Sequence, residues 1–570
     1  MKWISQRSSE PLLQVRVLPR AQIYFINLCL RQDSNGDKKS PQWAFPSHDQ
    51  QHLVDFKPWQ RNILIDCESS PTKDTKNTTM KITQSKIPEE VTRVTNTLEK
   101  AGFEAYLVGG CVRDLLIERK PKDWDITTNA KPEDILNLFE HTFYENNYGT
   151  VGIVSDETLE ENLKTIEVTP YRIEGKYSDR RHPDTVIFSN RLEDDLKRRD
   201  FTINAMAFSI SKNELIDLYK GQEDLKDKII RTVGKPDDRF NEDALRLLRA
   251  IRFATEINFT INTETEESIT KLAKNLKDIS QERIRKEFVK ILMSDMPMDG
   301  LILAQKLGIL KYVLPELELG IGEKQKGAHI YTIWEHNLRV LQHAADRKWS
   351  LNIRLSAILH DIAKPHTKRW NKEKKEFTFY GHDVVGERVS REILKRLKFP
   401  KETIDIVTKL VRNHMFFSDI DKITLSAVRR IISNVGPENI RDLMKLRACD
   451  RIGMGRPKEN PYRLRKYKAM IEEAMKDPIS VKMLKIDGKK LMDVLRETPG
   501  PKIGFILNAL MEEVLDNPSL NTIEYLENKA QELNKLSLEQ LKQLAESGKI
   551  KKEQKEAKEI KIIRERHHVK

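Results

Sequence analysis

The chain has 570 residues, with 100 Lys+Arg against 87 Asp+Glu, a formal net charge of +13 and 38% hydrophobic residues. This hydrophobic content excludes a largely disordered chain, and no apolar run reaches the roughly 18 residues that span a membrane. Four cysteines without C-x-x-C spacing argue against a disulfide framework or a thiolate zinc site and favour a reducing cytoplasm. The positive charge fits either a polyanionic partner or solvated helix faces, and charge alone leaves both open.

Residues 1–79 differ from the rest of the chain, because no helical or strand period runs through them. Their first 32 residues carry five basic residues and one acidic residue, which is typical of an organellar transit peptide. Met80 then opens a stretch that reads as a turn followed by an amphipathic helix with proline in its first turn. We therefore favour an irregular extension upstream of a native start at Met80 over a transit peptide.

Short β-branched or aromatic runs alternate with helical patterns from residue 80 to 220, which predicts an α/β domain. Beyond Glu242, strand signals almost vanish and helical periodicity continues nearly to the end. The tail 549–570 has nine Lys or Arg against four Glu, typical of a solvated basic helix that can also touch phosphates. The predicted strands are Ala105–Val108, Trp124–Ile126, Gly149–Val154, Thr165–Val168 and Thr185–Phe188.

Gly109 and Gly110 lie between the first predicted strand and a helix, where backbone N–H groups can approach a triphosphate. Alone, such a turn is weak evidence, since glycine often serves only a positive φ. Asp123 and Asp125 form a D-x-D pair on the next predicted strand, whose period of two places both carboxylates on one face. Two carboxylates held this close repel each other, and Mg²⁺ is the cation that suits such hard oxygen ligands. Together, the two features predict a magnesium-dependent nucleotide site.

This combination resembles the DNA-polymerase-β-like nucleotidyltransferase superfamily, and in particular its bacterial class II branch of tRNA CCA-adding enzymes and poly(A) polymerases. The resemblance implies a multidomain fold, with an α/β nucleotidyltransferase head followed by an all-α neck, body, HD domain and tail. The implied divisions are 1–79 (extension), 80–220 (catalytic head), 221–325 (neck and recognition region), 326–460 (HD domain), 461–548 (helical tail) and 549–570 (basic C-terminal extension).

A second motif, at 195–207, resembles the family segment associated with the ribose and phosphates of the nucleotide. Arg198 and Arg199 can offer guanidinium groups to phosphate. Asp200 and Asn204 can bond ribose hydroxyls. The alternative interpretation is a surface cluster of ion pairs.

A third motif, at 239–253, resembles the E-D-x-x-R motif of the family, in which protein side chains serve as the template. Asp243 and Arg246 are spaced i and i+3, so on a helix they project together, and the alternative is an ordinary helical ion pair. The resemblance implies that Asp243 accepts from the amino group of cytosine or adenine and that Arg246 donates to a ring acceptor. Uracil and guanine present a carbonyl there, so CTP and ATP would be selected. The implied nucleotide-binding set is Gly109, Gly110, Arg113, Arg198, Arg199, Asp200, Asn204, Asp243, Arg246 and Arg249.

Glu167 stands where the superfamily often has a further acidic residue. We assign it as a third catalytic carboxylate beside Asp123 and Asp125, the alternative being a partner for a basic loop residue. The stretch 171–183 resembles the flexible loop of enzymes that add the terminal A, which argues against an enzyme restricted to two C residues.

Three later segments resemble the H…HD…D signature of the HD superfamily: His336, the pair His360 and Asp361 ending an apolar helix, and Asp450 on a later helix. A lone helical histidine is usually a surface or satisfied core residue, but this pattern is far more specific. Imidazole and carboxylate ligands suit a divalent transition metal or Mg²⁺ that activates water for phosphoester hydrolysis. Further candidates are His382 and His414, for a second ion, and Lys364, for phosphate.

These motifs predict a template-independent CCA-adding activity with the tRNA acceptor arm, CTP and ATP as partners. In the expected two-metal mechanism, Asp123 and Asp125 hold Mg²⁺, the tRNA 3′-hydroxyl attacks and pyrophosphate leaves. The close alternatives are a poly(A) polymerase, which shares the motifs, and an A-adding enzyme. A distant alternative is an HD phosphohydrolase with a degenerate head. The HD signature and the lack of a basic Gly-Arg-Arg-Phe-like stretch at 147–152 favour CCA addition. The HD substrate and the oligomeric state stay open.

Overall fold

The computed structural model describes residues 80–545, with the exception of a few short segments. All described residues belong to one structural unit, Thr79–Lys570. The predictions for 1–79, for 549–570 and for part of the loop 171–183 fall outside the described residues. The exceptions within 80–545 are 146–147, 156–157, 159, 176, 178–182, 326–328, 374 and 416–422.

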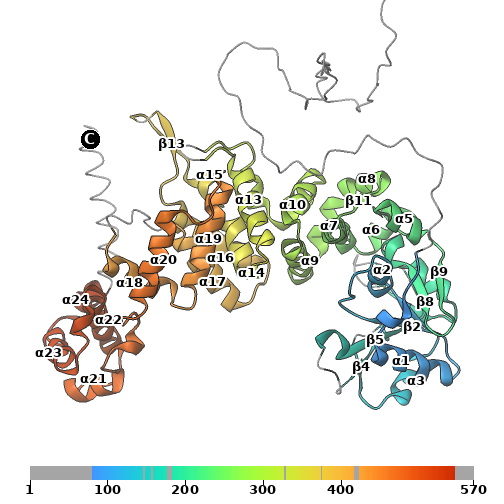
Figure 1. The fold of residues 1–570 in the computed structure, drawn as a ribbon, viewed down its shortest axis with the longest axis horizontal. Coiled ribbons are helices and arrows are strands. Elements are labelled where there is room, and N and C mark those ends of the chain that lie inside the picture. Colours follow the sequence, from blue (N-terminus) through green and yellow to red (C-terminus); the bar gives the residue numbers. More distant parts are fainter. Residues whose placement is uncertain are drawn as a thin grey trace, which may run out of the picture. The chain divides into compact units, whose positions relative to one another are not determined.

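A mixed sheet of seven strands forms the head, in the order β3-β4-β5-β2-β1-β8-β9 (Figure 1). β2 runs parallel to β5, and the other neighbouring strands are antiparallel. Both faces of β1 are buried, because Leu107 belongs to the large core whereas Tyr106 and Val108 belong to a second cluster. The strands are β1 (Ala105–Val108), β2 (Asp125–Thr128), β3 (Thr142–Tyr144), β4 (Val151–Val154), β5 (Thr165–Pro170), β8 (Met206–Ser209) and β9 (Glu214–Asp217).

Short helices and a hairpin cover this sheet. The predicted amphipathic helix after Met80 is α1, which begins after Pro88 and buries Val91, Val94 and Leu98. This burial follows from the helical spacing of the three apolar residues. The covering elements are α1 (Glu89–Lys100), α2 (Gly110–Leu116), α3 (Pro132–Leu138), α4 (Leu192–Lys197), α5 (Gly221–Asp227) and the hairpin β6 (Arg172–Glu174) with β7 (Val186–Phe188).

The described chain is almost entirely helical from α6 onward, as the sequence predicts. Three short strands interrupt this pattern in the described residues. β11 (Thr260–Ile261) pairs with β10 (Ile229–Ile230), which precedes α6, and β12 (Arg369–Asn371) pairs with β13 (Glu376–Thr378). The helices are α6 (Pro236–Glu242), α7 (Leu245–Ile257), α8 (Thr263–Leu272), α9 (Gln281–Met293), α10 (Pro297–Lys306), α11 (Leu310–Val313), α12 (Pro315–Glu318), α13 (Ile333–Asp346), α14 (Leu351–Leu359), α15 (Lys364–Thr367), α16 (His382–Arg396), α17 (Lys401–Asn413), α18 (Leu425–Val435), α19 (Ile440–Gly453), α20 (Tyr462–Ala474), α21 (Gly488–Leu495), α22 (Pro501–Asp516), α23 (Ile523–Leu533) and α24 (Leu538–Ala545).

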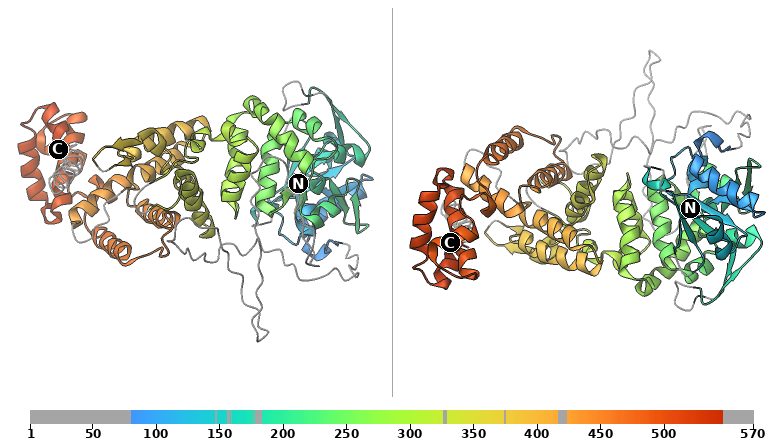
Figure 2. Two further views of the ribbon diagram at one scale, coloured as in Figure 1. Left: turned by 90° about the horizontal axis from the view of Figure 1, so that it is seen from above. Right: turned by 90° about the horizontal axis from the view of Figure 1, so that it is seen from below.

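The described residues build two main cores. One continuous apolar cluster runs from Ile82 to Ile479 and so includes the head sheet and α13–α19. A separate cluster, from Leu484 to Leu541, holds α21–α24 together, and these helices form the red group in Figure 2. Over the part of the chain that the structure describes, no helix combines the length and the apolar character needed to cross a membrane.

Candidate active sites

The turn between β1 and α2 requires glycine for two reasons. Gly109 has a φ of 80°, a conformation that L side chains rarely adopt. A Cβ at this position would also lie 3.1 Å from Arg199 Nη1 and 3.3 Å from Asp125 Oδ2. The missing side chain therefore keeps open the space between the strand end and the carboxylate. Gly109 and Gly110 line one cavity of about 380 Å³.

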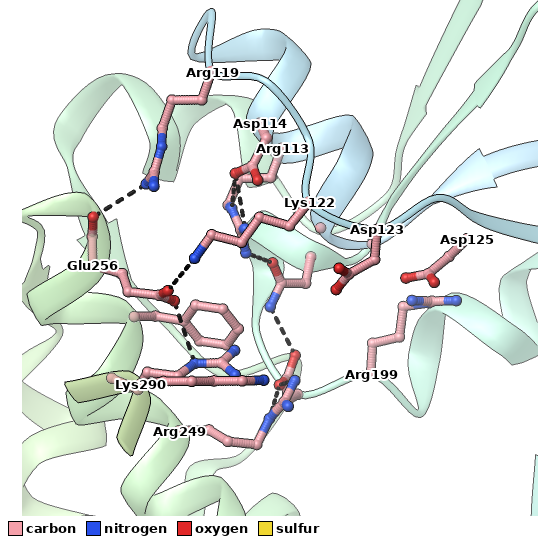
Figure 3. A pocket seen from close by; sticks show the side chains of 16 residues that line it. Arg113, Asp114, Arg119, Lys122, Asp123, Asp125, Arg199, Arg249, Glu256 and Lys290 are labelled. Atoms are coloured by element: carbon pink, nitrogen blue, oxygen red, sulfur yellow. Dashed lines mark hydrogen bonds and ion pairs between the residues drawn. The ribbon is translucent and has the colours of Figure 1, made fainter. Parts of the chain in front are cut away.

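Asp123 and Asp125 face this cavity with their carboxylates side by side (Figure 3). Asp125 is the first residue of β2, Asp123 precedes the strand, and Trp124 between them is buried. The burial of Trp124 turns its two neighbours toward the opposite side. Burial raises the pKa of Asp125 to about 6, and the Asp123 carboxylate adds to this rise while Arg199 opposes it. The negative charges of two neighbouring carboxylates repel each other. Their oxygen atoms are therefore suitable ligands for a hard divalent cation such as Mg²⁺, which compensates this repulsion.

Glu167 lies next to this pair across the sheet. It is the register partner of Asp125 on the parallel strand β5. Desolvation raises the pKa of Glu167 to about 7, together with the charges of Asp125, Glu145 and Asp123. Glu167 is not among the described residues that line the cavity, so its role as a third catalytic carboxylate stays a prediction.

A chain of hydrogen bonds runs along another wall of the cavity. Arg113 Nη1 donates to Asn204 Oδ1 at 2.7 Å, and Asn204 Nδ2 donates to Asp200 Oδ1 at 3.1 Å. Arg249 Nε donates to Asp200 Oδ2 at 2.8 Å. Burial opposes the charge of Asp200, but the nearby arginines outweigh it and hold the pKa of Asp200 well below its usual value. The network fixes the guanidinium groups of Arg113 and Arg249 at the cavity, where they can meet an anion.

The two arginines predicted to bind phosphate have different positions. Both pair with the fully buried Asp195 of α4, and Asp195 Oδ2 lies 2.9 Å from Arg199 Nη2. Arg198 also pairs with Glu174 of β6, at 3.2 Å. Among the described residues, Arg199 lines the cavity and Arg198 does not. Arg199 therefore lies beside Asp125, whereas Arg198 ties α4 to β6.

The predicted base-reading pair does not share a helical face. α7 begins at Leu245, and Asp243 lies before it with extended backbone, so the expected i, i+3 arrangement on one helix is wrong. Asp243 Oδ1 accepts from the Leu245 N–H, the first of α7, at 3.0 Å. Its Oδ2 lies 2.8 Å from Arg283 Nη2 of α9, whereas Arg246 Nη1 lies 2.6 Å from Glu242 Oε2. Each side chain thus has its own partner.

The second site brings all six predicted HD residues together. Ligand atoms of His336, His360 and Asp361 lie within 4.8 Å of one another, and so do those of Asp361, His382 and His414. Asp361 belongs to both groups, because its Oδ2 lies 3.2 Å from His336 Nε2 and its Oδ1 lies 3.4 Å from His382 Nε2. Asp450 Oδ1 lies 3.3 Å from His336 Nε2.

Backbone carbonyls orient three of these imidazoles. The Nδ1 atom lies 2.9 Å from the Ala357 carbonyl in His360, 2.7 Å from the Phe379 carbonyl in His382 and 2.6 Å from the Val411 carbonyl in His414. Because Nδ1 donates its hydrogen to the carbonyl, the Nε2 atom of each ring, on the side of Asp361, carries a lone pair that can bind a metal ion. Burial also lowers the pKa of His382 to about 4, which keeps that ring neutral. The donor set fits a divalent transition metal.

A cavity of about 270 Å³ opens onto these groups. Lys364 Nζ lies 2.6 Å from Asp361 Oδ2 within it, where the ammonium group can also meet a phosphate. The described lining residues are Gln325, His329, Asp361, Lys364, Phe379, Tyr380, His382, His414, Met415, Arg447, Asp450 and Met454.

Comparison with known proteins assigns the family. A model described as "Poly A polymerase head domain" matches residues 105–231, one described as "Probable RNA and SrmB- binding site of polymerase A" matches 258–320, and an HD domain model matches 333–455. A CCA-adding enzyme of Leuconostoc mesenteroides is 32% identical over 457 residues, which cover 80% of this chain and 98% of that protein. The chain belongs to the CCA-adding enzyme family.

Other members match over different lengths. The CCA-adding enzyme of Lactobacillus helveticus is 48% identical over 199 residues, 35% of this chain and 48% of that protein, so the match spans about half of that relative. The crystal structure of the Bacillus stearothermophilus CCA-adding enzyme in complex with CTP is 26% identical, with a TM-score of 0.58, and covers 79% of this chain and 98% of that chain. A further CCA-adding enzyme structure, 19% identical with a TM-score of 0.51, shares the fold over 78% of this chain and 96% of that chain.

Several residues at the first cavity of this CCA-adding family member were not predicted. Lys122 Nζ lies 2.8 Å from Glu256 Oε1, next to the D-x-D pair (Figure 3). Arg249, Arg252 and Glu256 follow the helical period of α7, so continuing the face that starts at Arg249 would have found two of them. Lys290 reaches the cavity from α9 and had no such signal in the sequence. The unpredicted lining residues are Asp114, Arg119, Lys122, Arg252, Phe253, Glu256 and Lys290.

Proposed function

We propose that this protein adds CMP, CMP and AMP in turn to the 3′ end of tRNA, using CTP and ATP and releasing pyrophosphate. The observation that carries the proposal is the single cavity that joins the Gly109 turn, the Asp123 and Asp125 carboxylates and the Asp200 network. Membership of the CCA-adding family supports it, as does the CTP complex of the Bacillus stearothermophilus enzyme. A cytoplasmic location belongs to the same proposal and is supported by the buried free thiols of Cys111 and Cys449.

The acidic end of the cavity is the proposed catalytic centre. Asp123 and Asp125 are the residues that would hold Mg²⁺. When bound, the ion supplies positive charge to the phosphoryl group in transfer. Gly109 leaves room beside the carboxylates for a phosphate group, and Arg199 places a guanidinium group next to that space. Fixed charges of this kind stabilise developing charge without having to reorganise during the reaction.

The network wall is the proposed binding surface for ribose and phosphates. Asn204 and Asp200 hold Arg113 and Arg249 in place, so these two arginines lose little side-chain freedom when an anion binds. Both oxygens of Asp200 already accept hydrogen bonds, and a ribose hydroxyl would share one of them with the present donors.

Base selection by Asp243 and Arg246 stays part of the proposal. Asp243 lies six residues and Arg246 lies three residues before Arg249, which lines the cavity. The Asp243 carboxylate accepts from Arg283 in the present structure, so the amino group of cytosine or adenine would replace or share that donor. The carbonyl of uracil or guanine cannot donate, which leaves two acceptors facing each other.

In the test, the full-length protein is incubated with one of three RNAs and with each of the four NTPs in turn. The three RNAs are tRNA that lacks the whole CCA end, tRNA that lacks only the terminal A, and an unrelated oligoribonucleotide. We expect CTP to be used first on the shortest tRNA, followed by a single ATP, and ATP alone to be used on the second tRNA. Extension of any RNA by ATP alone would instead identify a poly(A) polymerase and contradict the proposal.

A second activity, hydrolysis of a phosphoester at the HD cluster, is favoured by the sharing of Asp361 between two groups of metal-binding side chains. A bound divalent ion would activate water there. The residues that face the substrate would be Lys364, which carries positive charge toward a phosphate, and Arg447, which lines the same cavity. Hydrolysis of 2′,3′-cyclic AMP with Mn²⁺, Ni²⁺ or Mg²⁺ tests this activity, and an Asp361→Asn variant that hydrolyses as fast as the wild type would contradict it.

A further inference from the structure

The β12–β13 hairpin begins and ends at the HD cavity. Lys364 lines the cavity just before β12, and Phe379 and Tyr380 line it directly after β13. Lys368, at the base of the hairpin, pairs with Glu323. The hairpin projects from the neighbouring helices at the label β13 in Figure 1. A ligand that extends out of the cavity past Phe379 and Tyr380 would therefore meet this hairpin.

One face of the hairpin carries two exposed aromatic rings. Trp370 and Phe377 are directly opposed across the strands, so their side chains lie on the same face. Their ring centroids are 5.0 Å apart, and yet 54% of Trp370 and 42% of Phe377 stay exposed. Lys368 Nζ lies 4.2 Å from the centroid of the Phe377 ring. We call Lys368, Trp370 and Phe377 the aromatic face.

Lysine and aromatic contacts connect this face to the metal-binding groups. Lys364 Nζ, 2.6 Å from Asp361 Oδ2, lies 5.9 Å from the centroid of the Phe379 ring. Phe379 lies two residues after Phe377, which belongs to the aromatic face. Rings interleaved with ammonium groups are the pattern on which single-stranded nucleic acids bind, because bases stack on the rings and phosphates pair with the cations.

The size of the cavity and the local charge point to the same ligand. At about 270 Å³, the cavity is below the roughly 300–1,000 Å³ of pockets that enclose a drug-sized ligand, so it suits a terminal phosphate and its sugar. The segment 364–380 has six Lys or Arg against two Glu, an excess that favours a polyanion outside the cavity.

We propose that the aromatic face binds single-stranded RNA whose 3′-terminal phosphoester enters the HD cavity. The inference rests on the proposed phosphohydrolase role of the HD cluster and adds a binding surface for the RNA next to the cavity. Bases next to the terminal nucleotide stack on Trp370 and Phe377, and Lys368 meets the backbone. Binding is tolerant of sequence, because every base offers a π face.

The test compares two leucine variants of the full-length protein. Trp370→Leu keeps an apolar cross-strand partner for Phe377 but removes the stacking surface. Tyr462→Leu is the matched control, because Tyr462 is an aromatic residue with 65% exposure at the start of α20, outside the cavity. The probe is a short oligoribonucleotide with a 2′,3′-cyclic phosphate end and a 4-thiouridine before its last nucleotide.

We expect ultraviolet cross-links from the probe to the segment 364–380 in the wild type. Trp370→Leu should raise the KM for hydrolysis of the probe about tenfold, as loss of one stacked base does, and leave hydrolysis of 2′,3′-cyclic AMP unchanged. Cross-links only outside 364–380, or equal KM values in the two variants, would overturn the proposal. Cross-links at the hairpin without hydrolysis of either substrate would support the binding face and contradict only the phosphohydrolase role.

Discussion

Asp361 joins the two groups of side chains proposed to bind metal, because each of its carboxylate oxygens faces a different set of histidines. We expect Asp361→Asn to lose divalent metal from both groups, since an amide is a neutral and weaker ligand. His382→Ala removes a ligand from one group only and should retain about half of the metal content of the wild type. Elemental analysis after dialysis against Mn²⁺ measures both variants. Equal metal loss in the two would contradict a shared Asp361.

The sequence predicted which residues of the HD motif lie close together better than it predicted the contacts of the residues in the head. His360 and Asp361 follow an apolar helix, and their burial next to His336 comes from the packing of α13 against α14 and α19. The spacing of Asp243 and Arg246 was less informative. The Asp243 side chain accepts from the first N–H of α7, and no local pattern reveals its partner Arg283, which lies 40 residues away. Partners that come from distant helices depend on tertiary packing, which a single sequence does not encode in its periodicity.

At the level of elements, Arg198 at the end of α4 holds this helix to β6 by pairing with Glu174. The fully buried Asp195 of α4 pairs with Arg198 and with Arg199. Burial opposes its charge, but the two arginines prevail and lower the pKa of Asp195 to about 2. A carboxyl group with a pKa below its unfolded value stabilises the fold above that value and stops doing so as pH falls through the folded pKa. The contribution is therefore fully present above about pH 5 and fades between about pH 4 and 2.

Asp195→Asn should lower the free energy of unfolding by about 3–5 kcal/mol near pH 6, because it leaves two arginines without their buried partner. The difference from the wild type should shrink as pH falls from about 4 toward 2. Urea unfolding followed by circular dichroism at several pH values measures it. Glu193→Gln, an exposed change on the same helix, is the control and should shift stability by less than about 0.5 kcal/mol. A difference independent of pH would contradict the assigned ion pairs.

The sequence predicted strands where β-branched or aromatic residues are continuous. It missed strands that are short or that lie in charged segments. The prediction for Ala105–Val108 matches β1, and Thr165–Val168 falls within β5. β12 and β13 have three residues each and lie in a charged segment, so no period of two was visible. β8 was not predicted, because its first two residues, Met206 and Ala207, were assigned to the motif at 195–207. All four residues of this strand are buried.

At the scale of the whole molecule, gross charge says less about function than its distribution does. Of the formal +13, residues 1–79 hold +3 and the tail 549–570 holds +5, which leaves +5 for everything between. The described lining of the head cavity nevertheless has seven Lys or Arg beside five Asp or Glu. Acidic residues for a cation and basic residues for phosphates lie in one cavity, as transfer from a nucleoside triphosphate requires.

We propose that nucleotide addition takes place in this head cavity. The most direct measurement follows CTP and ATP incorporation into tRNA lacking its CCA end by Asp123→Ala and by Asp227→Ala, an exposed aspartate at the end of α5. Asp123→Ala should reduce incorporation of both nucleotides by at least about a thousand-fold, because it removes a carboxylate from the proposed catalytic centre. Asp227→Ala should keep the wild-type rate. Full incorporation by Asp123→Ala would contradict a catalytic role for this cavity.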